Sequence, residues 1–403
     1  ADIYREHVNR VGFMGGQAGE TPVFANTTEP GRTLRIGLVS ADFRQHSVAS
    51  FIAPLLARYD RSAGEITCYA DVSNPDDVTR QLRTVAGNWC DICGMTDAQV
   101  VEQVRADRID ILVDLAGHTA GNRLRVFAAR AAPVQVTWLG YPNTTGLAAM
   151  DYRLTDAWAD PPGNTGDCYT EKLVRLPGCF ICYQPPDDAP EPAACPADDN
   201  GFVTYGSFNN YVKITRDVVA CWAAVLQAVP GSRLILKNFS LSDPEVRAAC
   251  LERFSEFDIP AERLELHGVV ESRREHLALY SQVDIALDTF PYNGTTTSCE
   301  SLWMGIPVIT LAGDRHAGRV GLSLLSSLEL TQLVADDQPG FVAIAVRLAA
   351  DNMQRRQWRA GLRGIMQSSM LCDGHAFARK IESAWRDMWT HWCQHQARES
   401  RPG

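Results

Sequence analysis

The stretch VDIALDTFPYNGTTTSCESLWMGIPVI, residues 283–309, joins a short apolar run to a segment with helical spacing through a loop of small and polar residues. The apolar run is typical of a strand in a parallel sheet that is buried on both faces. Gly294 and the consecutive threonines Thr295 to Thr297 stand where the helix should begin. We predict that Thr297 caps this helix, because Thr297 and Glu300 match the capping box, in which each side chain bonds a backbone amide.

Capping leaves the preceding residues Asn293, Gly294, Thr295 and Thr296 unexplained. A loop that opens a helix after a strand presents free backbone N–H groups, and hydroxyl side chains add further donors. Such a loop binds an anion without needing a basic side chain. The sequence therefore predicts that this loop holds a negatively charged ligand such as a diphosphate.

Apolar strands alternate with amphipathic helical segments along most of the chain. We expect buried strands at residues 34–43, 65–73, 109–117, 134–142, 202–208, 232–239, 263–269, 284–290 and 306–313. This alternation is typical of parallel sheets covered by helices on both faces, and it restarts after a segment rich in Pro and acidic residues. We therefore predict an α/β protein with two Rossmann-like doubly wound lobes facing a central cleft.

The same patterns set the expected domain boundaries. They are an N-terminal helix and linker at 1–30, an N-terminal lobe at 31–182, an interlobe linker at 183–200, a C-terminal lobe at 201–372 and a C-terminal helix at 373–403. The Gly- and Thr-rich part of the first linker should be mobile. The last helix carries an apolar stripe that should dock on the lobes, at Phe377, Ile381, Trp385, Met388 and Trp392.

Composition excludes several classes of function. The formal net charge of −10 over 403 residues argues against a nucleic-acid surface, and no apolar run is long enough to span a membrane. We expect a cytoplasmic protein whose twelve cysteines are free thiols, and we interpret the CxxC pairs Cys90/Cys93 and Cys179/Cys182 as structural. No G-x-G-x-x-G or P-loop motif occurs, and no motif demands a metal or a cofactor.

Polar loops follow the expected strands, at the edge where parallel sheets bind ligands. His46 lies in the first such loop and could take a proton from a hydroxyl group, with Ser47 a plausible cap of the next helix. His118 and Thr119 lie between two glycines in another loop. Lys213, one of four lysines, follows the first strand of the second lobe, where an ammonium group suits a phosphate.

With these motifs in view, the chain resembles the catalytic region of the O-GlcNAc transferase and SPINDLY family of protein glycosyltransferases. The motifs that carry the resemblance are RIGLVSADFRQHSV, DILVDLAGHTAGNRL, APVQVTWLGYPNTTG, GSFNNYVKIT, DTFPYNGTTTSCESLWMG and LAGDRHAGRVGLSLL. The resemblance implies a glycosyltransferase B fold. It also implies a metal-independent, inverting transfer of a sugar from a nucleotide sugar to Ser or Thr of protein or peptide acceptors.

The resemblance also implies roles for individual residues. Lys213 would stabilise the departing diphosphate, and His46 would lie near the acceptor as a candidate base. The donor would be bound by Asn210, Arg273, His276, Thr295, Thr296, Thr297 and Glu300. The pocket around the transferred sugar and the acceptor would comprise His118, Thr119, Leu139, Gly140 and Pro142.

Two positions separate this chain from O-GlcNAc transferase proper, which has histidine at the position of Thr295 and aspartate at that of Glu300. Here the chain looks more like SPINDLY, whose plant members use GDP-fucose. UDP-GlcNAc is the leading donor and GDP-fucose the alternative. An Asn-directed N-glucosyltransferase and a non-catalytic nucleotide- or partner-binding scaffold stay open. Family members also carry N-terminal tetratricopeptide repeats, which this chain does not contain.

Overall fold

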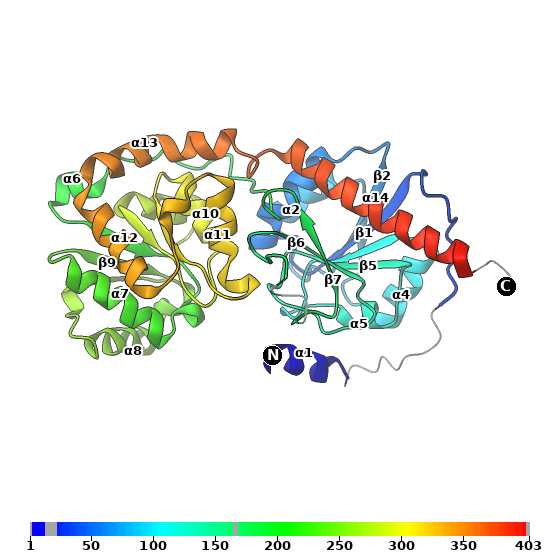
Figure 1. The fold of residues 1–403 in the computed structure, drawn as a ribbon, viewed down its shortest axis with the longest axis horizontal. Coiled ribbons are helices and arrows are strands. Elements are labelled where there is room, and N and C mark those ends of the chain that lie inside the picture. Colours follow the sequence, from blue (N-terminus) through cyan, green and yellow to red (C-terminus); the bar gives the residue numbers. More distant parts are fainter. Residues whose placement is uncertain (1, 13–21, 164–167, 400–403) are drawn as a thin grey trace. The chain divides into compact units, whose positions relative to one another are not determined.

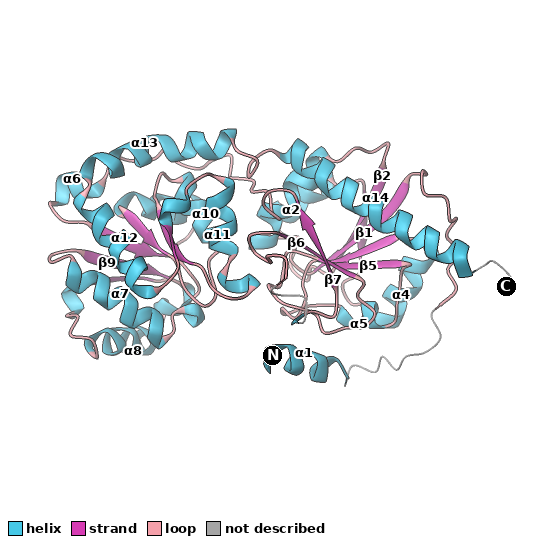
Figure 2. Ribbon diagram, in the orientation of Figure 1, coloured by secondary structure: helices cyan, strands magenta, loops and turns pink. Residues whose placement is uncertain are grey.

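The computed structural model describes residues 2–12, 22–163 and 168–399, so part of the linker predicted at 1–30 lies outside the described residues. The chain divides into two compact units. Unit 1 comprises residues 1–184 and 373–403, and unit 2 comprises residues 185–372. Each unit is built on its own parallel sheet with helices beside it (Figure 2). The predicted fold class, two doubly wound α/β lobes, is confirmed, and the cleft between them stays a prediction.

Unit 1 contains, among its described residues, a seven-stranded parallel sheet in the order β3-β2-β1-β4-β5-β6-β7. Its strands are β1 (Leu34–Ser40), β2 (Gly64–Ala70), β3 (Asn88–Asp91), β4 (Ile111–Asp114), β5 (Val134–Thr137), β6 (Tyr152–Asp156) and β7 (Lys172–Leu176). Its helices are α1 (Asp2–Gly12), α2 (Ser47–Arg58), α3 (Asp77–Val85), α4 (Asp97–Ala106), α5 (Leu124–Ala128) and α14 (Gly374–Glu399). Every residue of β4 and β5 is buried, as continuous apolar strands between helix layers require.

Unit 2 contains, in the part that the structure describes, a six-stranded parallel sheet in the order β10-β9-β8-β11-β12-β13. Its strands are β8 (Thr204–Ser207), β9 (Arg233–Lys237), β10 (Leu264–His267), β11 (Ile285–Leu287), β12 (Val308–Leu311) and β13 (Val334–Ala335). Its α-helices are α6 (Pro196–Asn200), α7 (Arg216–Ala228), α8 (Pro244–Ser255), α9 (Arg273–Ala278), α10 (Thr296–Trp303), α11 (Val320–Ser327), α12 (Gln338–Ala350) and α13 (Asn352–Ser368). Short 3-10 helices include η2 (Tyr211–Lys213) and η5 (Leu279–Gln282).

The order of strands fixes where each sheet can bind a ligand. Chain order reverses between β1 and β4 in unit 1 and between β8 and β11 in unit 2. At such a reversal the two loops that leave the carboxyl ends of adjacent strands turn in opposite directions and open a crevice. The loops after β8 and after β11 therefore flank the crevice of unit 2, and the loops after β1 and after β4 flank that of unit 1.

Helix α14 returns the chain to unit 1 after unit 2 is complete (red in Figure 1). It packs against α2, β5 and β7, and it buries Phe377, Ile381, Trp385 and Met388, whereas Trp392 is only partly buried. The predicted apolar stripe is thus used, and its docking surface is unit 1. The Trp389 indole also donates to the Glu29 carbonyl oxygen at 3.1 Å.

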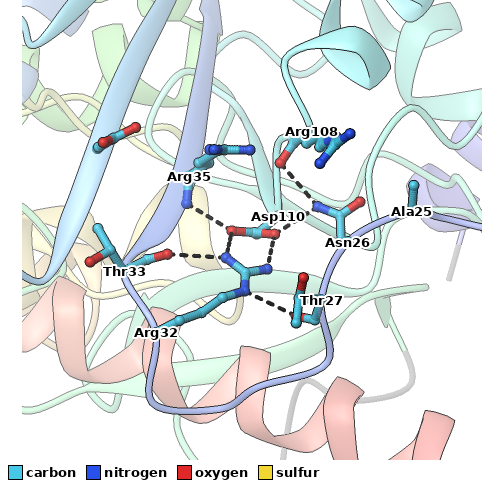
Figure 3. A pocket seen from close by; sticks show the side chains of 9 residues that line it. Ala25, Asn26, Thr27, Arg32, Thr33, Arg35, Arg108 and Asp110 are labelled. Carbon is cyan, nitrogen blue, oxygen red and sulfur yellow. Dashed lines mark hydrogen bonds and ion pairs between the residues drawn. The ribbon is translucent and has the colours of Figure 1, made fainter.

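The amino edge of the unit 1 sheet has a cavity of about 330 Å³, and the ion pair of Arg32 with Asp110 is part of its lining (Figure 3). Asp110 is fully buried, and its carboxylate accepts two hydrogen bonds from the Arg32 guanidinium, one from the Asn26 amide and one from the Arg35 backbone N–H. These bonds hold the segment 25–33 on the sheet. Because ligands bind at the opposite, carboxyl edge of such sheets, this cavity is not our candidate site.

No helix within the described ranges is both long and apolar enough to cross a membrane.

Candidate active site

In unit 2 the loops that flank the crevice meet through Lys213. The Lys213 ammonium donates to the Asn293 carbonyl oxygen at 2.8 Å and lies 3.8 Å from the centroid of the Tyr292 ring. Burial lowers the pKa of Lys213 to about 8, an effect that the nearby Asp288 carboxylate partly offsets. Asn210 supports this placement, because its side chain accepts from the Val212 amide and caps the η2 turn that ends at Lys213. The lysine is therefore held in place before any ligand arrives.

Asp288 organises the loop that carries Asn293. It is buried, and its carboxylate accepts from the backbone amides of Thr289 and Gly294 at 2.8 and 2.7 Å and from the Thr310 hydroxyl at 2.9 Å. Burial raises the pKa of Asp288 to about 6 against the opposing effect of these bonds and of the Lys213 ammonium. The Asp288 carboxylate thus fixes the conformation of the loop 289–294.

Helix α10 begins two residues earlier than a cap at Thr297 predicts, and the predicted capping box is wrong. The helix starts at Thr296, Thr295 is its N-cap residue without a side-chain capping bond, and the Thr297 hydroxyl donates instead to the Asn209 side-chain oxygen at 3.1 Å. Glu300 does not reach back to the helix start. Its carboxylate accepts from His276 Nε2 at 3.0 Å and from the Tyr280 hydroxyl at 3.4 Å, tertiary partners that a local sequence pattern does not reveal.

Because no capping box forms, the helix start keeps groups that a ligand can use. The Thr296 hydroxyl oxygen is buried and has no hydrogen-bond partner within the described part of the chain. The first amides of α10 likewise have no acceptor side chain on Thr295. A buried hydroxyl without a partner is costly unless a ligand satisfies it, and the end of the helix dipole favours an anion. The anion site predicted for this loop is therefore consistent with the geometry.

A second cluster lies beside Glu300 and suits a nucleoside. His276 packs with Phe208 and Tyr280, with ring centroids 5.6 Å apart in both pairs, and its Nδ1 is buried without a hydrogen-bond partner among the described residues. Arg273 is the first residue of α9, one turn before His276. Aromatic and imidazole rings provide stacking surfaces for a base, and a carboxylate accepts from ribose hydroxyl groups.

Lys237 is a cation of this cluster that sequence reasoning left unassigned. It ends β9, and burial lowers its pKa while the Glu300 carboxylate opposes that shift. The sequence signal that could have pointed to Lys237 is the rarity of lysine, since the chain contains only four. Asp288, Tyr292, Asn209 and Tyr280 were missed because only the folded loops bring them to the site.

In unit 1, His46 lies at the start of α2. It is the N-cap residue, in place of the predicted Ser47, because its Nδ1 accepts from the Val48 amide at 3.3 Å. The same nitrogen is 3.6 Å from the Asp42 carboxylate, and burial lowers the pKa of His46. The ring is about two fifths exposed, so a substrate can reach it.

The loop after β4 places His118 and Thr119. Buried Asp114 accepts from the amides of Ala116 and Gly117 and from the Thr137 hydroxyl, which folds the chain back at the end of the strand. The Thr119 hydroxyl then donates to the Ala116 carbonyl oxygen at 2.8 Å.

His118 Nε2 lies 2.8 Å from the Thr145 carbonyl oxygen, so Nε2 carries the proton and Nδ1 is left as an acceptor. Burial lowers the pKa of His118, and the neighbouring His7 and Arg10 add to that effect. The ring is therefore neutral near pH 7.

The turn after β5 contains the other predicted pocket residues, Leu139, Gly140 and Pro142. Leu139 has a positive φ of 77°, a backbone conformation that is uncommon for residues other than glycine. A Cβ on Gly140 would lie 2.0 Å from the Leu115 carbonyl oxygen, so only glycine fits. This close approach brings the turn against the loop that carries His118.

The predicted site residues thus form two groups. Asn210, Lys213, Arg273, His276, Thr295, Thr296, Thr297 and Glu300 surround the crevice of unit 2, and His46, His118, Thr119, Leu139, Gly140 and Pro142 follow strands of unit 1. All lie after the carboxyl ends of strands, as the sequence predicts.

None of the twelve cysteines, all of which lie in the described residues, is in a disulfide. Cys179 and Cys182 are buried, as their apolar context predicts, although they lie after β7 rather than in a strand. Across residues 2–12, 22–163 and 168–399, no group of three or more His, Cys, Asp or Glu side chains is arranged to hold a metal ion.

Comparison with known proteins identifies the family. The model of glycosyl transferase family 41 matches residues 18–184 and 196–381. A rice protein named as a probable UDP-N-acetylglucosamine--peptide N-acetylglucosaminyltransferase SPINDLY is 45% identical over 91% of this chain, and the Arabidopsis thaliana SEC protein, given the same activity, is 29% identical over 91%. The chain spans only 40% of the rice protein and 38% of SEC.

Among solved structures, an O-GlcNAc transferase mutant from Thermobaculum terrenum superposes with a TM-score of 0.91 and 39% identity. The match covers 98% of this chain and 74% of that one.

Proposed function

The chain belongs to glycosyltransferase family 41, with the glycosyltransferase B fold, and we propose that it transfers a sugar from a nucleotide-sugar donor to Ser or Thr hydroxyl groups of proteins. One observation carries this proposal. Lys213, the start of α10 and the Thr296 hydroxyl, which has no partner among the described residues, lie on the two loops that flank the crevice between β8 and β11, and we propose that they hold a diphosphate there. The names of the relatives support a peptide acceptor and UDP-GlcNAc as the leading donor.

The proposed reaction is an inverting, metal-independent displacement. The acceptor oxygen attacks the anomeric carbon of the sugar, the bond to the diphosphate breaks, and the nucleoside diphosphate leaves with the electron pair. The Lys213 ammonium, the amides at the start of α10 and the Thr296 hydroxyl would stabilise the charge that develops on the diphosphate. Donors fixed in advance where charge develops are the most effective form of electrostatic stabilisation in enzymes.

The roles of the remaining residues follow from their contacts. We propose that Glu300 accepts from the ribose hydroxyl groups and that His276 and Arg273 contact the nucleoside. His46 is the proposed base. Its Nδ1 accepts from the Val48 amide and lies 3.6 Å from the Asp42 carboxylate, so Nδ1 would have to release the amide and take the ring proton, facing Asp42, before the Nε2 lone pair becomes available to the acceptor hydroxyl. His118, Thr119, Leu139, Gly140 and Pro142 would line the side of the sugar and the acceptor.

GDP-fucose is the second candidate donor, favoured by Thr295 and Glu300 and by the higher identity to SPINDLY than to SEC. Transfer of glucose to Asn is a further alternative. The decisive experiment is a panel of UDP-GlcNAc, GDP-fucose and UDP-glucose in thermal-shift and transfer assays. The true donor should raise the melting temperature by mass action and label an acceptor peptide. A protein that responds to none of them would contradict the proposed function and favour a non-catalytic scaffold.

A further inference from the structure

Helix α1 is fixed to unit 1 through His7, which is only 8% exposed. His7 Nδ1 lies 2.6 Å from the Ile3 carbonyl oxygen, and since a carbonyl can only accept, Nδ1 carries the ring proton. The lone pair of the neutral ring is therefore on Nε2, which lies 2.8 Å from the Tyr141 hydroxyl. The Tyr141 hydroxyl donates this bond, so its proton points to His7.

Helix α1 also packs closely against unit 1 on both sides of the hydrogen bond between His7 and Tyr141. The His7 ring meets the edge of the His118 ring, with centroids 4.7 Å apart. A Cβ on Gly146 would lie 2.8 Å from the His7 carbonyl carbon, so α1 lies directly on the backbone of the 139–147 loop. Such close packing fixes the position of α1 relative to the 139–147 loop.

The groups that His7 touches are those of the proposed acceptor side. His118 is itself one of the proposed pocket residues, and Tyr141 lies between two others, Gly140 and Pro142. Tyr141 also packs on the loop after β4, because a Cβ on Gly117 would lie 2.3 Å from the Tyr141 Cβ. One side chain of α1 therefore contacts both loops that form the pocket.

We propose that His7 is a positioning residue for the transfer reaction, and that α1 forms the outer wall of the acceptor-side pocket. His7 fixes the Tyr141 hydroxyl and the His118 ring, and through them the 139–147 and 117–119 loops. This inference rests on the proposed function. It assigns to the N-terminal helix a part in catalysis that is separate from donor binding, since all the proposed donor residues lie in unit 2.

The test compares His7→Ala with His391→Ala, which removes an exposed histidine of α14. His7→Ala should lower kcat/KM for the acceptor peptide about 10- to 100-fold, the loss expected when a reacting group is misplaced by about 1 Å. Its Kd for the donor should stay within about twofold of wild type, and His391→Ala should change neither quantity. An unchanged kcat/KM in folded His7→Ala overturns the inference.

Two further variants separate positioning from loss of folding. His7→Gln, whose amide oxygen can still accept from Tyr141, should recover part of the activity. Tyr141→Phe removes the donor of the same hydrogen bond, so the double variant should lose no more activity than His7→Ala alone. Full additivity of the two losses would show that the hydrogen bond has no positioning role.

Amide hydrogen exchange does not depend on turnover, so it tests the role of His7 separately from the proposed function. In wild type and in His391→Ala, amides of residues 139–147 should exchange with solvent more slowly than in His7→Ala, because α1 covers them. If the wild-type protein transfers no sugar, the proposed function fails while this comparison still decides whether α1 holds the loop. Equal exchange in all three proteins contradicts the inference.

Discussion

The Lys213 ammonium and the Asn293 carbonyl oxygen are 2.8 Å apart, which joins the loop after β8 to the loop after β11 across the point where strand order reverses. The lysine is therefore already in the crevice, bonded to a neutral partner. A diphosphate offers a stronger, charge-assisted bond than a carbonyl group does, so a ligand can replace Asn293 with little rearrangement.

Lys213→Ala should abolish most transfer while sparing the fold. Loss of one positioned donor to a developing negative charge lowers kcat about 10²- to 10³-fold. The matched control is Lys172→Ala on β7, which removes an exposed lysine. Steady-state transfer and thermal unfolding measure the two effects, and undiminished turnover in Lys213→Ala would remove this residue from the mechanism.

The transfer activity should decrease as the pH rises above about 8. Lys213 must be protonated to stabilise the diphosphate, and its pKa is lowered to about 8 in the free protein. As pH rises through about 8 the free enzyme loses this proton, so kcat/KM for the donor should fall about tenfold per pH unit above that value.

Lys213→Arg supplies the check on this assignment. A guanidinium group stays charged across this range, so whatever activity the variant keeps should show no decline near pH 8. The same alkaline limb in Lys213→Arg would assign the titration to another group.

Thr296→Val should separate ligand binding from stability. The Thr296 hydroxyl oxygen is buried without a partner among the described residues, so replacing it by a methyl group should leave the melting temperature equal or higher. A hydrogen bond to a charged group contributes about 1.5–3 kcal/mol, so Kd for the donor should rise about 10- to 100-fold.

Thr297→Val is the comparison, because the Thr297 hydroxyl already bonds Asn209 at 3.1 Å in the ligand-free protein. This variant should lose about 1 kcal/mol of unfolding free energy. Calorimetry and thermal unfolding on both variants test the distinction, and the idea fails if Thr296→Val binds donor as wild type does.

Asp110→Ala should destabilise unit 1. It removes the buried carboxylate that accepts from the Arg32 guanidinium, the Asn26 amide and the Arg35 backbone N–H, and breaking a buried ion pair in this way costs about 3–5 kcal/mol. Asp77→Ala, which removes the exposed pair with Arg80, should change stability little. Denaturant unfolding of the two variants gives the comparison, and equal stabilities would contradict the role assigned to Asp110.

The sequence predicted most of the sheets because their strands are apolar and regularly spaced. It missed the edge strands β3 and β7, whose residues are largely exposed or only partly buried, so their sequences lack the continuous apolar signal. It also missed the two-residue edge strand β13 and the strand β6, which is buried throughout but contains Arg153, Thr155 and Asp156 and so has no apolar run. The helix α3 was also missed. Its strongest local signal is a capping box built from Asp76 and Thr79, a pairing outside the usual Ser/Thr-x-x-Glu pattern.

The site was predictable to the extent that its residues lie in loops after strands. Glu300 shows the limit. Its spacing from Thr297 matched a capping box, yet His276 and Tyr280, more than a dozen positions away in the sequence, hold its carboxylate. Asp288 shows the same limit, because its importance depends on amides that only the folded loop brings to it.

The return of α14 to unit 1 has a consequence for biosynthesis. Unit 2 is one continuous segment, so it can complete its core as soon as residue 372 has left the ribosome. Unit 1 is begun before unit 2 but needs α14 to cover α2 and Trp389 to hold the segment near Glu29. Of the two units, the one whose synthesis starts earlier is therefore the later to finish folding, and its nascent chain has an uncovered apolar surface while all of unit 2 is made.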